Sequence, residues 1–362
     1  MQHRDIGAAT PSLNLVLDEV APSGLRNHRS WRAGASIDAV PFHIDTDSRH
    51  HMTDRLTPGT AIGPAGTRPD PILRHTIARE HVGSGPTDVP RRPGPVEVSG
   101  PIERILAVSD LHLHPARLDW VIDRAERYDL LVVAGDTLDT AVVRAGDPVE
   151  INRFIERLAD RTRVAICSGN HDLDSVDSHG ERVCRWISHA AGVGVAVDGD
   201  VLLTPELSVS VCGWWDGPVG AERLRRQVLD HERLAGERRR IWVHHAPVAD
   251  SPIAWDGRRD RGDRHLARLV DDLTPDIVIS GHVHQAPFAD GGDWHDRRGS
   301  ALLLNPGQPT GGRPAAIEID LAADTATWHS SIGSTALSET IPLTPPAETR
   351  SSGQHRVLSR VS

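Results

Sequence analysis

The 362-residue chain contains no lysine, so arginine supplies all 40 of its basic residues. Alanine, glycine, proline and aspartate are plentiful, as in proteins from GC-rich genomes, and the excess of arginine therefore carries no functional information by itself. Together with 50 acidic residues, these arginines leave a formal net charge of -10. Because nucleic-acid phosphates are bound by clustered basic residues, this charge argues against extended nucleic-acid binding. A small phosphate-containing substrate is compatible with it.

Cysteines and long apolar runs are also few. The three cysteines, Cys167, Cys184 and Cys212, show no CxxC spacing, which favours buried, reduced thiols over a disulfide. The sequence has no run of about 18 apolar residues and no basic-then-apolar leader, the patterns of a membrane span and of a secretory signal. We therefore expect a cytoplasmic protein that does not interact with a membrane.

The chain changes in composition twice. Residues 1–101 are rich in proline, glycine, histidine and arginine, with Asn14–Val20 as the one segment suited to order. Such a segment buries too little apolar surface to offset its chain entropy, so we expect a disordered N-terminal extension. Residues 102–330 alternate apolar and amphipathic stretches and are expected to form one catalytic domain. Residues 331–362, rich in serine, threonine, proline and arginine, are expected to be a disordered tail.

The apolar runs of the central region predict strands, and the amphipathic stretches between them predict helices. The predicted strands are Ile105–Ser109, Leu130–Ala134, Val164–Ser168, Val209–Cys212, Ile241–Val243, Ile277–Ser280 and Leu302–Leu304. The predicted helices are Arg117–Arg127, Val149–Arg161, Gly180–Ala191, Ala221–Ala235 and Asp263–Asp272. This alternation is typical of an at least partly parallel sheet. Ala315–Leu321 and Ala326–Ser330 instead predict a terminal hairpin.

Five of the predicted strands end on residues that bind metals or transfer protons. In order, these residues are Asp110 and His112, Asp136, Asn170 and His171, His244 or His245, and His282 and His284. On an extended segment, residues two apart point the same way, so Asp110 and His112 can bind one cation together. Functional sites of open α/β sheets lie beyond the carboxyl ends of the strands. Each block alone is a weak signal, but the ordered set predicts a metal site.

The ordered blocks D-x-H, G-D, G-N-H-[DE], H and G-H-x-H resemble the calcineurin-like metallophosphoesterases over roughly Ile105 to Leu304. The resemblance implies an α/β fold: a two-sheet mixed β-sandwich flanked by helices on both faces, in four layers (α/β/β/α). It also implies two metal ions. For the first ion the implied ligands are Asp110, His112 and His284; for the second they are Asn170, His244 and His282, with Asp136 bridging the two. His171 is implied as a proton donor or oxyanion stabiliser.

Several roles stay open at this stage. Only one of His244 and His245 should bind metal, and we favour His244 because it is nearer the strand end. Asp172 is expected to orient His171 or a ligand. His114 either approaches the substrate or faces solvent.

Carboxylate and imidazole ligands suit two divalent or trivalent ions such as Mn, Fe or Zn, and a bridging carboxylate holds two cations about 3.5–4 Å apart. A water shared by the ions becomes a bridging hydroxide near neutral pH and attacks phosphorus, while His171 can protonate the leaving alkoxide. The sequence therefore predicts a dinuclear metal-dependent hydrolase of a small phosphodiester or phosphomonoester. The alternatives are a nuclease for single-stranded nucleic acid and a non-catalytic metal-binding interaction module. The sequence does not specify an oligomeric state.

Substrate specificity is expected to depend on less standard segments. Trp214, Trp215 and the arginine-rich loop Ser251–Arg264 could hold a base and a phosphate, or could equally cover a sheet edge and face solvent. Arg238–Arg240 are expected to be a solvated face. The turn Asn305–Gln308 (NPGQ) is expected to shape the floor of the pocket.

Overall fold

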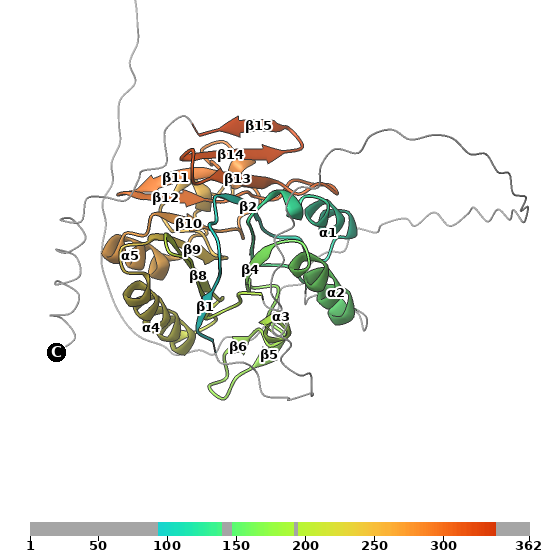
Figure 1. Cartoon of the computed structure of the whole chain (residues 1–362). Helices are drawn as coiled ribbons and strands as arrows, with labels where there is room; N and C mark the ends of the chain where they lie inside the picture. The colour runs from blue at the N-terminus through green and yellow to red at the C-terminus, as the bar shows by residue number, and fades with distance from the viewer. Residues whose placement is uncertain (1–92, 140–146, 192–194, 338–362) are drawn as a thin grey trace, which may run out of the picture. The chain divides into compact units, whose positions relative to one another are not determined.

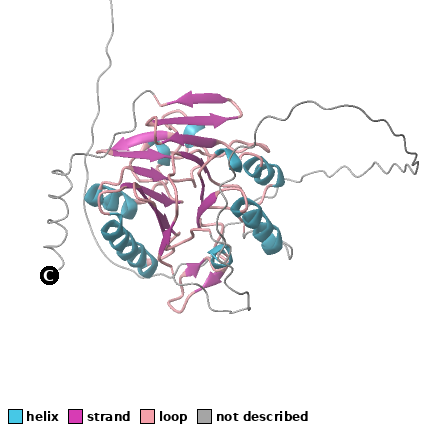
Figure 2. Cartoon of the chain, viewed as in Figure 1, coloured by secondary structure: helices cyan, strands magenta, loops and turns pink. Residues whose placement is uncertain are grey.

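The computed structural model describes residues 93–139, 147–191 and 195–337. Two large sheets lie face to face in this part of the chain, with helices on their outer sides (Figure 1, Figure 2). This arrangement confirms the predicted α/β class, a two-sheet mixed β-sandwich flanked by helices on both faces. None of the helices in the described ranges is long and apolar enough to span a membrane.

The first sheet has seven strands within the described residues and mixes parallel and antiparallel pairs. In spatial order they are β1 (Pro95–Glu97), β7 (Val201–Leu203), β8 (Leu207–Cys212), β9 (Arg239–His244), β10 (Ile277–Ile279), β12 (Ala301–Leu304) and β11 (His295–Arg298). The central strands β8, β9, β10 and β12 run parallel, and β11 pairs antiparallel with β12. The parallel core brings the carboxyl ends of β9 and β10 to one edge.

The second sheet has six strands in the described part of the chain. Their order is β15 (Gly333–Ala336), β14 (Thr325–Ser330), β13 (Ala316–Asp320), β2 (Arg104–Val108), β3 (Leu130–Ala134) and β4 (Arg163–Cys167). The pairs β2–β3 and β3–β4 are parallel, whereas β13 pairs antiparallel with both β2 and β14. The predicted terminal hairpin is therefore confirmed, and it adds onto the parallel strands that carry Asp110 and Asp136.

The helices cover the outer faces of both sheets. Those on the second sheet are α1 (Pro115–Ile122), α2 (Asp147–Ala159) and α3 (Ile187–Ala191); those on the first sheet are α4 (Pro218–Ala235) and α5 (Arg264–Leu273). Short 3₁₀ turns are η1 (Ala125–Arg127), η2 (Pro252–Ala254) and η3 (Ala286–Phe288). The Asp263 carboxylate caps α5 by accepting the N–H groups of His265 and Leu266, which fixes where that helix begins.

Side chains alternate between two apolar layers along each central strand. In β2, Ile105 and Ala107 pack between the sheets, whereas Leu106 and Val108 pack under α1 and α2. In β9, Val243 likewise faces the opposite sheet and Trp242 faces α4 and α5. Because strand residues alternate sides, both faces of these strands are buried, which explains their nearly continuous apolar sequences.

The described fold extends beyond residues 102–330 at both ends. Strand β1 pairs in parallel with β7, and β15 pairs antiparallel with β14. Both are edge strands and largely exposed, so they need few apolar residues and give little signal in the sequence. The rest of the predicted extension and tail, Asn14–Val20 included, lies outside the described residues.

One predicted helix and one predicted solvated face differ from the structure. Within Gly180–Ala191 only α3 is helical, and Arg182–Val183 forms β6, which pairs with β5 (Ser175–Val176). Arg239 and Arg240 belong to β9, and their side chains are only 11% and 9% exposed. Charge alone suggested solvation, but α4 supplies a carboxylate that lets Arg240 be buried.

Arg240→Ala is expected to lower the free energy of unfolding by about 3–5 kcal/mol, because it leaves the Glu232 carboxylate buried without its partner. The Arg240 guanidinium pairs with Glu232 and donates to the carbonyl of Leu273, thereby joining β9 to α4 and α5. Urea unfolding measures the loss. The control is Arg226→Ala, which breaks an ion pair whose arginine is 73% exposed and should leave the transition unchanged. Equal transitions for both variants would contradict this assignment.

Candidate metal centre

Hydrogen bonds join the loops that follow β2, β3, β4, β9 and β10. The Asp110 N–H donates to the Gly135 carbonyl (3.0 Å), and the His171 N–H donates to Asp136 Oδ1 (2.8 Å). On the other sheet, the Gly281 N–H donates to the His245 carbonyl (2.9 Å). The His282 N–H reaches Asp110 Oδ2 at 3.2 Å and so connects the two sheets. The five predicted strand ends therefore converge at one place.

The backbone at this place is strained. Asp110, His112, Asp136 and His282 have φ angles of 56°, 48°, 51° and 67°. Left-handed backbone costs non-glycine residues of the order of 1–3 kcal/mol each and persists only where the surroundings enforce it. The hydrogen bonds between the loops provide that enforcement. Conformations of this kind concentrate at functional sites.

Glycines of the motifs make room for side chains from other strands. A Cβ atom on Gly169 would lie 2.2 Å from Asp136 Oδ1, and one on Gly281 would lie 2.7 Å from Asp110 Oδ2. Any larger residue would displace these carboxylates. The glycines in GNHD and GHVH are therefore part of how the acidic side chains are held.

Asp110, His112 and His284 form the first group of possible metal ligands, with ligand atoms within 4.8 Å of one another. His284 Nε2 lies 3.0 Å from Asp110 Oδ1 and 3.3 Å from His112 Nε2. Burial by itself would raise the pKa of Asp110, but the hydrogen bond with His284 and the charge of His245 bring that pKa below its usual range. An ionised carboxylate facing two ring nitrogens can hold a cation.

Asp136, His245 and His282 form the second group, again within 4.8 Å. His245 Nε2 lies 3.0 Å from Asp136 Oδ2, and His245 Nδ1 donates to the Ala134 carbonyl (2.7 Å), which turns Nε2 toward the group. Burial lowers the pKa of His245, but the Asp136 carboxylate outweighs it and raises that pKa to about 9. Burial and the charge of His245 lower the pKa of His282 to about 4.

His244, favoured from the sequence, does not lie in either group. Its Nδ1 is 3.1 Å from the Cys212 carbonyl and its Nε2 is 3.7 Å from Asp263 Oδ2. His244 ends β9 on the same side as Trp242, whereas His245 shares the side of Val243, which faces between the sheets. The geometry therefore places His245, and not His244, beside Asp136. The sequence alone does not reveal which face of β9 points inward.

Asn170 brings an unsatisfied oxygen to the same region. Its Oδ1 is buried and has no hydrogen-bond partner in the described structure. A buried acceptor without a partner costs about 1–3 kcal/mol, so the position is unfavourable unless something binds there. The amide oxygen therefore fits a role as a neutral ligand, and the complete donor set fits a pair of cations.

His171 lies at the edge of the first group. Its ring centroid is 5.1 Å from that of His112, and its Nδ1 is 3.0 Å from Asp139 Oδ1. Asp172, expected to orient His171 or a ligand, instead accepts the N–H groups of Leu138 and Gly169, both at 2.8 Å. Asp172 thus joins the loops after β3 and β4, and Asp139 partners His171. Asp139 was not predicted from the sequence, because its contact with His171 depends on how the loops after β3 and β4 meet.

Burial, reinforced by the charge of Asp136, raises the pKa of Asp172 to about 8. A carboxyl group that is neutral near pH 7 adds no further negative charge beside Asp136.

The neighbouring tryptophans Trp214 and Trp215 have different surroundings. The Trp214 ring centroid lies 5.7 Å from that of His245 and 5.4 Å from that of His282. Trp215 donates from Nε1 to Asp263 Oδ2 (2.6 Å) and packs with the core beneath α4 and α5. Only Trp214 therefore borders the site.

His114 is exposed at the start of α1.

The NPGQ turn supports the GHVH loop. The Asn305 side-chain amide donates to the Val283 carbonyl (3.2 Å), and the Gln308 N–H donates to the His284 carbonyl (3.0 Å). These bonds fix the backbone on both sides of His284.

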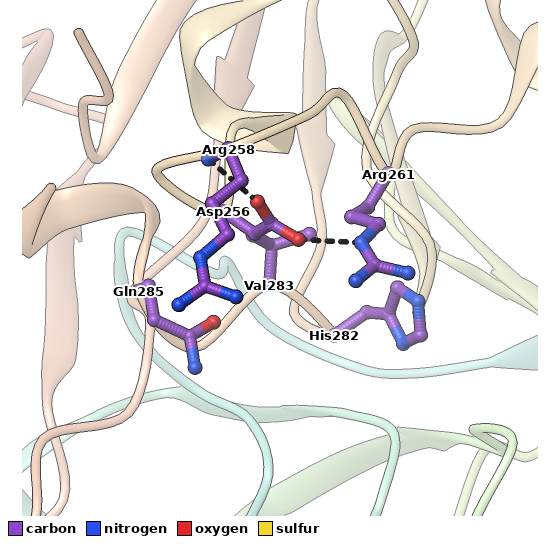
Figure 3. Close-up of a pocket in the computed structure, with 6 residues that line it drawn as sticks. All are labelled: Asp256, Arg258, Arg261, His282, Val283 and Gln285. Atoms are coloured by element: carbon purple, nitrogen blue, oxygen red, sulfur yellow. Dashed lines mark hydrogen bonds and ion pairs between the residues drawn. The ribbon is translucent and has the colours of Figure 1, made fainter.

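A pocket of about 470 Å³ adjoins His282 (Figure 3). Its lining residues are Asp256, Arg258, Arg261, His282, Val283 and Gln285. Part of the arginine-rich loop therefore lies next to the second group of ligands.

Several solved structures are similar to this chain. A dimetal phosphatase from Danio rerio is 13% identical, with 67% of this chain and 100% of that chain covered and a TM-score of 0.42. A purple acid phosphatase from yellow lupin (Lupinus luteus) seeds is 12% identical, with coverages of 69% and 58% and a TM-score of 0.40. GAP50, described as the anchor in the inner membrane complex of Plasmodium, is 13% identical, with coverages of 69% and 94% and a TM-score of 0.44.

No curated protein sequence matches the chain. The profile of the calcineurin-like phosphoesterases matches residues 103–286, which is half of the chain and includes all five motif blocks. The chain belongs to the calcineurin-like phosphoesterase family, as its motifs predicted.

Proposed function

We propose that the protein is a dinuclear metal-dependent hydrolase that cleaves a small phosphodiester or phosphomonoester. The observation that carries this proposal is the pair of adjoining donor groups, Asp110–His112–His284 and Asp136–His245–His282. The His282 N–H bond to Asp110 joins them directly. Carboxylate and imidazole donors suit Mn, Fe or Zn, whose ions can act as a pair on a phosphoryl group.

Asp110, His112 and His284 would hold one ion. The other would be held by Asn170, His245 and His282, and Asp136 would bridge the two. His245 thus replaces His244 in the set implied by the sequence motifs. Asp136 suits the bridging role because one of its oxygens faces His245 and the other accepts the His171 N–H.

Ions bound here would lower the pKa of a shared water to give a hydroxide nucleophile and would neutralise charge on the phosphoryl oxygens. His171 is suited to the proton transfer. Its Nδ1 contacts the Asp139 carboxylate, and this leaves Nε2 to donate a proton to the leaving alkoxide. The His171 side chain is 39% exposed, as a group that meets substrate at the mouth of a site requires.

Protein loaded with Mn or Zn is expected to release p-nitrophenolate from bis-p-nitrophenyl phosphate or p-nitrophenyl phosphate. Chelation should abolish this release and metal should restore it, because the protein's own groups do not replace the cations. Metal analysis should find two ions per chain. No turnover together with fewer than two tightly bound ions would instead favour a non-catalytic metal-binding module.

To identify the physiological ester, hydrolysis has to be measured on a wider panel of cyclic nucleotides, nucleotides, dinucleotides, phospholipid head groups and single-stranded DNA. Each is tested with Mn and with Zn separately. Preferential cleavage of single-stranded DNA would identify a nuclease in place of a small-substrate hydrolase. The cytoplasmic location remains a prediction from the sequence.

A further inference from the structure

We propose that Arg258 and Arg261 bind a second phosphoryl group of the substrate, so that the preferred phosphoester carries two phosphoryl groups. One would lie at the metal centre and the other in the pocket beside His282. This inference rests on the proposed function and specifies its substrate class.

The position of the pocket supports the inference. His282, a member of the second ligand group, is one of its lining residues, and Val283 and Gln285 continue from it along the same loop. The arginine-rich loop after η2 forms the opposite wall (Figure 3). A substrate bound at the metal centre can therefore extend past His282 directly into the pocket.

The loop that carries the two arginines is organised without any ligand. The Asp256 carboxylate accepts the N–H groups of Arg258 (2.8 Å) and Arg259 (2.9 Å) and also pairs with Arg261 Nε (2.5 Å). The Arg261 N–H donates to the Ala254 carbonyl (2.9 Å), which closes the loop back on η2. The backbone of the loop is thus held in place and Asp256 holds the Arg261 guanidinium, so that mainly the Arg258 side chain has to be ordered on binding.

The charges of the pocket are not balanced by its own residues. Asp256 neutralises one arginine, Arg261, whereas the Arg258 side chain makes no hydrogen bond or ion pair with any described residue. In Figure 3 the Arg258 guanidinium lies toward Gln285 and that of Arg261 lies above His282. The pocket therefore keeps an excess positive charge in a chain whose net charge is -10.

The chemistry of the lining favours a phosphoryl group over a base or an apolar group. The guanidinium plane presents parallel N–H donors that match phosphate oxygens, and the Gln285 amide can add a neutral donor. No tryptophan, tyrosine or phenylalanine is among the lining residues, so the pocket offers no large ring on which a base would stack. A phosphoryl group carries about -1.5 to -2 charge near pH 7, which the uncompensated charge of Arg258 partly offsets and to which Arg261 can add N–H donors.

The test uses alkane-α,ω-bisphosphonates with two to five methylene groups, each compared with the alkylphosphonate of equal length, as competitive inhibitors of p-nitrophenyl ester turnover. At one chain length the bisphosphonate is expected to bind at least about tenfold more tightly. Arg258→Ala should reduce this advantage to about threefold or less, and Arg258→Lys should retain part of it. The constants of the alkylphosphonates, which have no second phosphoryl group to reach the pocket, should change by less than about twofold.

Arg259→Ala is the matched control, because Arg259 shares the loop and its bonding to Asp256 but does not line the pocket. This variant should still bind the bisphosphonate more tightly than the alkylphosphonate, by the same factor as the native protein. Calorimetry with the metal-loaded protein measures the same affinities without turnover. The inference is wrong, and the proposed function is unaffected, if the ester is turned over but no bisphosphonate binds more tightly than its alkylphosphonate. The same holds if Arg258→Ala leaves the tighter binding of the bisphosphonate unchanged. If the loaded protein neither turns over the ester nor binds alkylphosphonates, the proposed function itself fails.

Discussion

Asp136→Asn is expected to reduce turnover of p-nitrophenyl esters by on the order of a thousandfold in protein exposed to Mn or Zn. Asp136 is 1% exposed, and its carboxylate is a member of the second ligand group. Asparagine keeps its shape and can still accept the His171 N–H, but it removes the charge that would bridge two cations. Steady-state kinetics and metal analysis on the same sample should show lost activity with fewer than two ions retained.

The matched control for this substitution is Asp119→Asn. Asp119 lies on α1 with a side chain that is 66% exposed and belongs to neither ligand group, so its replacement removes the same charge outside the candidate site. Its turnover and metal content should equal those of the native protein. If Asp136→Asn keeps both ions and normal turnover, Asp136 is not a bridging ligand and the dinuclear proposal is wrong.

His245→Ala and His244→Ala are expected to have opposite effects, although the two residues are adjacent. Removing His245 takes a ring nitrogen from the second group, so we expect loss of one ion and a reduction in turnover of about a hundredfold or more. Removing His244 should leave two ions bound. It leaves the Cys212 carbonyl without its partner, at a cost of about 1–3 kcal/mol in unfolding free energy.

Metal analysis distinguishes the two variants even if both lose stability, because it is measured on the folded fraction. Urea unfolding of each variant gives the accompanying change in stability. Retention of both ions by His245→Ala, with loss of one by His244→Ala, would restore the assignment favoured from the sequence.

The strands that build the site were readily predicted from the sequence. Leu130–Ala134 has the bounds of β3, and Ile277–Ser280 differs from β10 by one residue. These strands are buried on both faces and therefore appear as continuous apolar runs that end abruptly at polar residues. The same abrupt ends located the candidate ligands, because the residues that can bind metal follow directly after the strands.

The features that could not be predicted from the sequence depend on contacts between segments that are far apart in the chain. The inward face of β9, and so the choice between His244 and His245, follows from how the two sheets meet. The burial of Arg240 depends on Glu232 from α4. Strands β1 and β15 are mostly exposed, so their apolar content resembles that of a loop. In each case the structure depends on residues elsewhere in the chain, so the local sequence contains no pattern that predicts it.

The contact between Gly169 and Asp136 has a consequence for how this sequence can change over time. Only glycine fits at position 169 while the Asp136 carboxylate occupies its place, because a Cβ atom would overlap Oδ1 at 2.2 Å. The two positions, 33 residues apart in number, are therefore constrained as a pair. Loss of the Asp136 carboxylate alone would not admit a larger residue at position 169, because a Cβ atom would still lie 2.6 Å from the Asp136 backbone nitrogen and 2.8 Å from His245 Cδ2. Descendants of this chain that give up the metal centre by losing the carboxylate should therefore still keep the glycine.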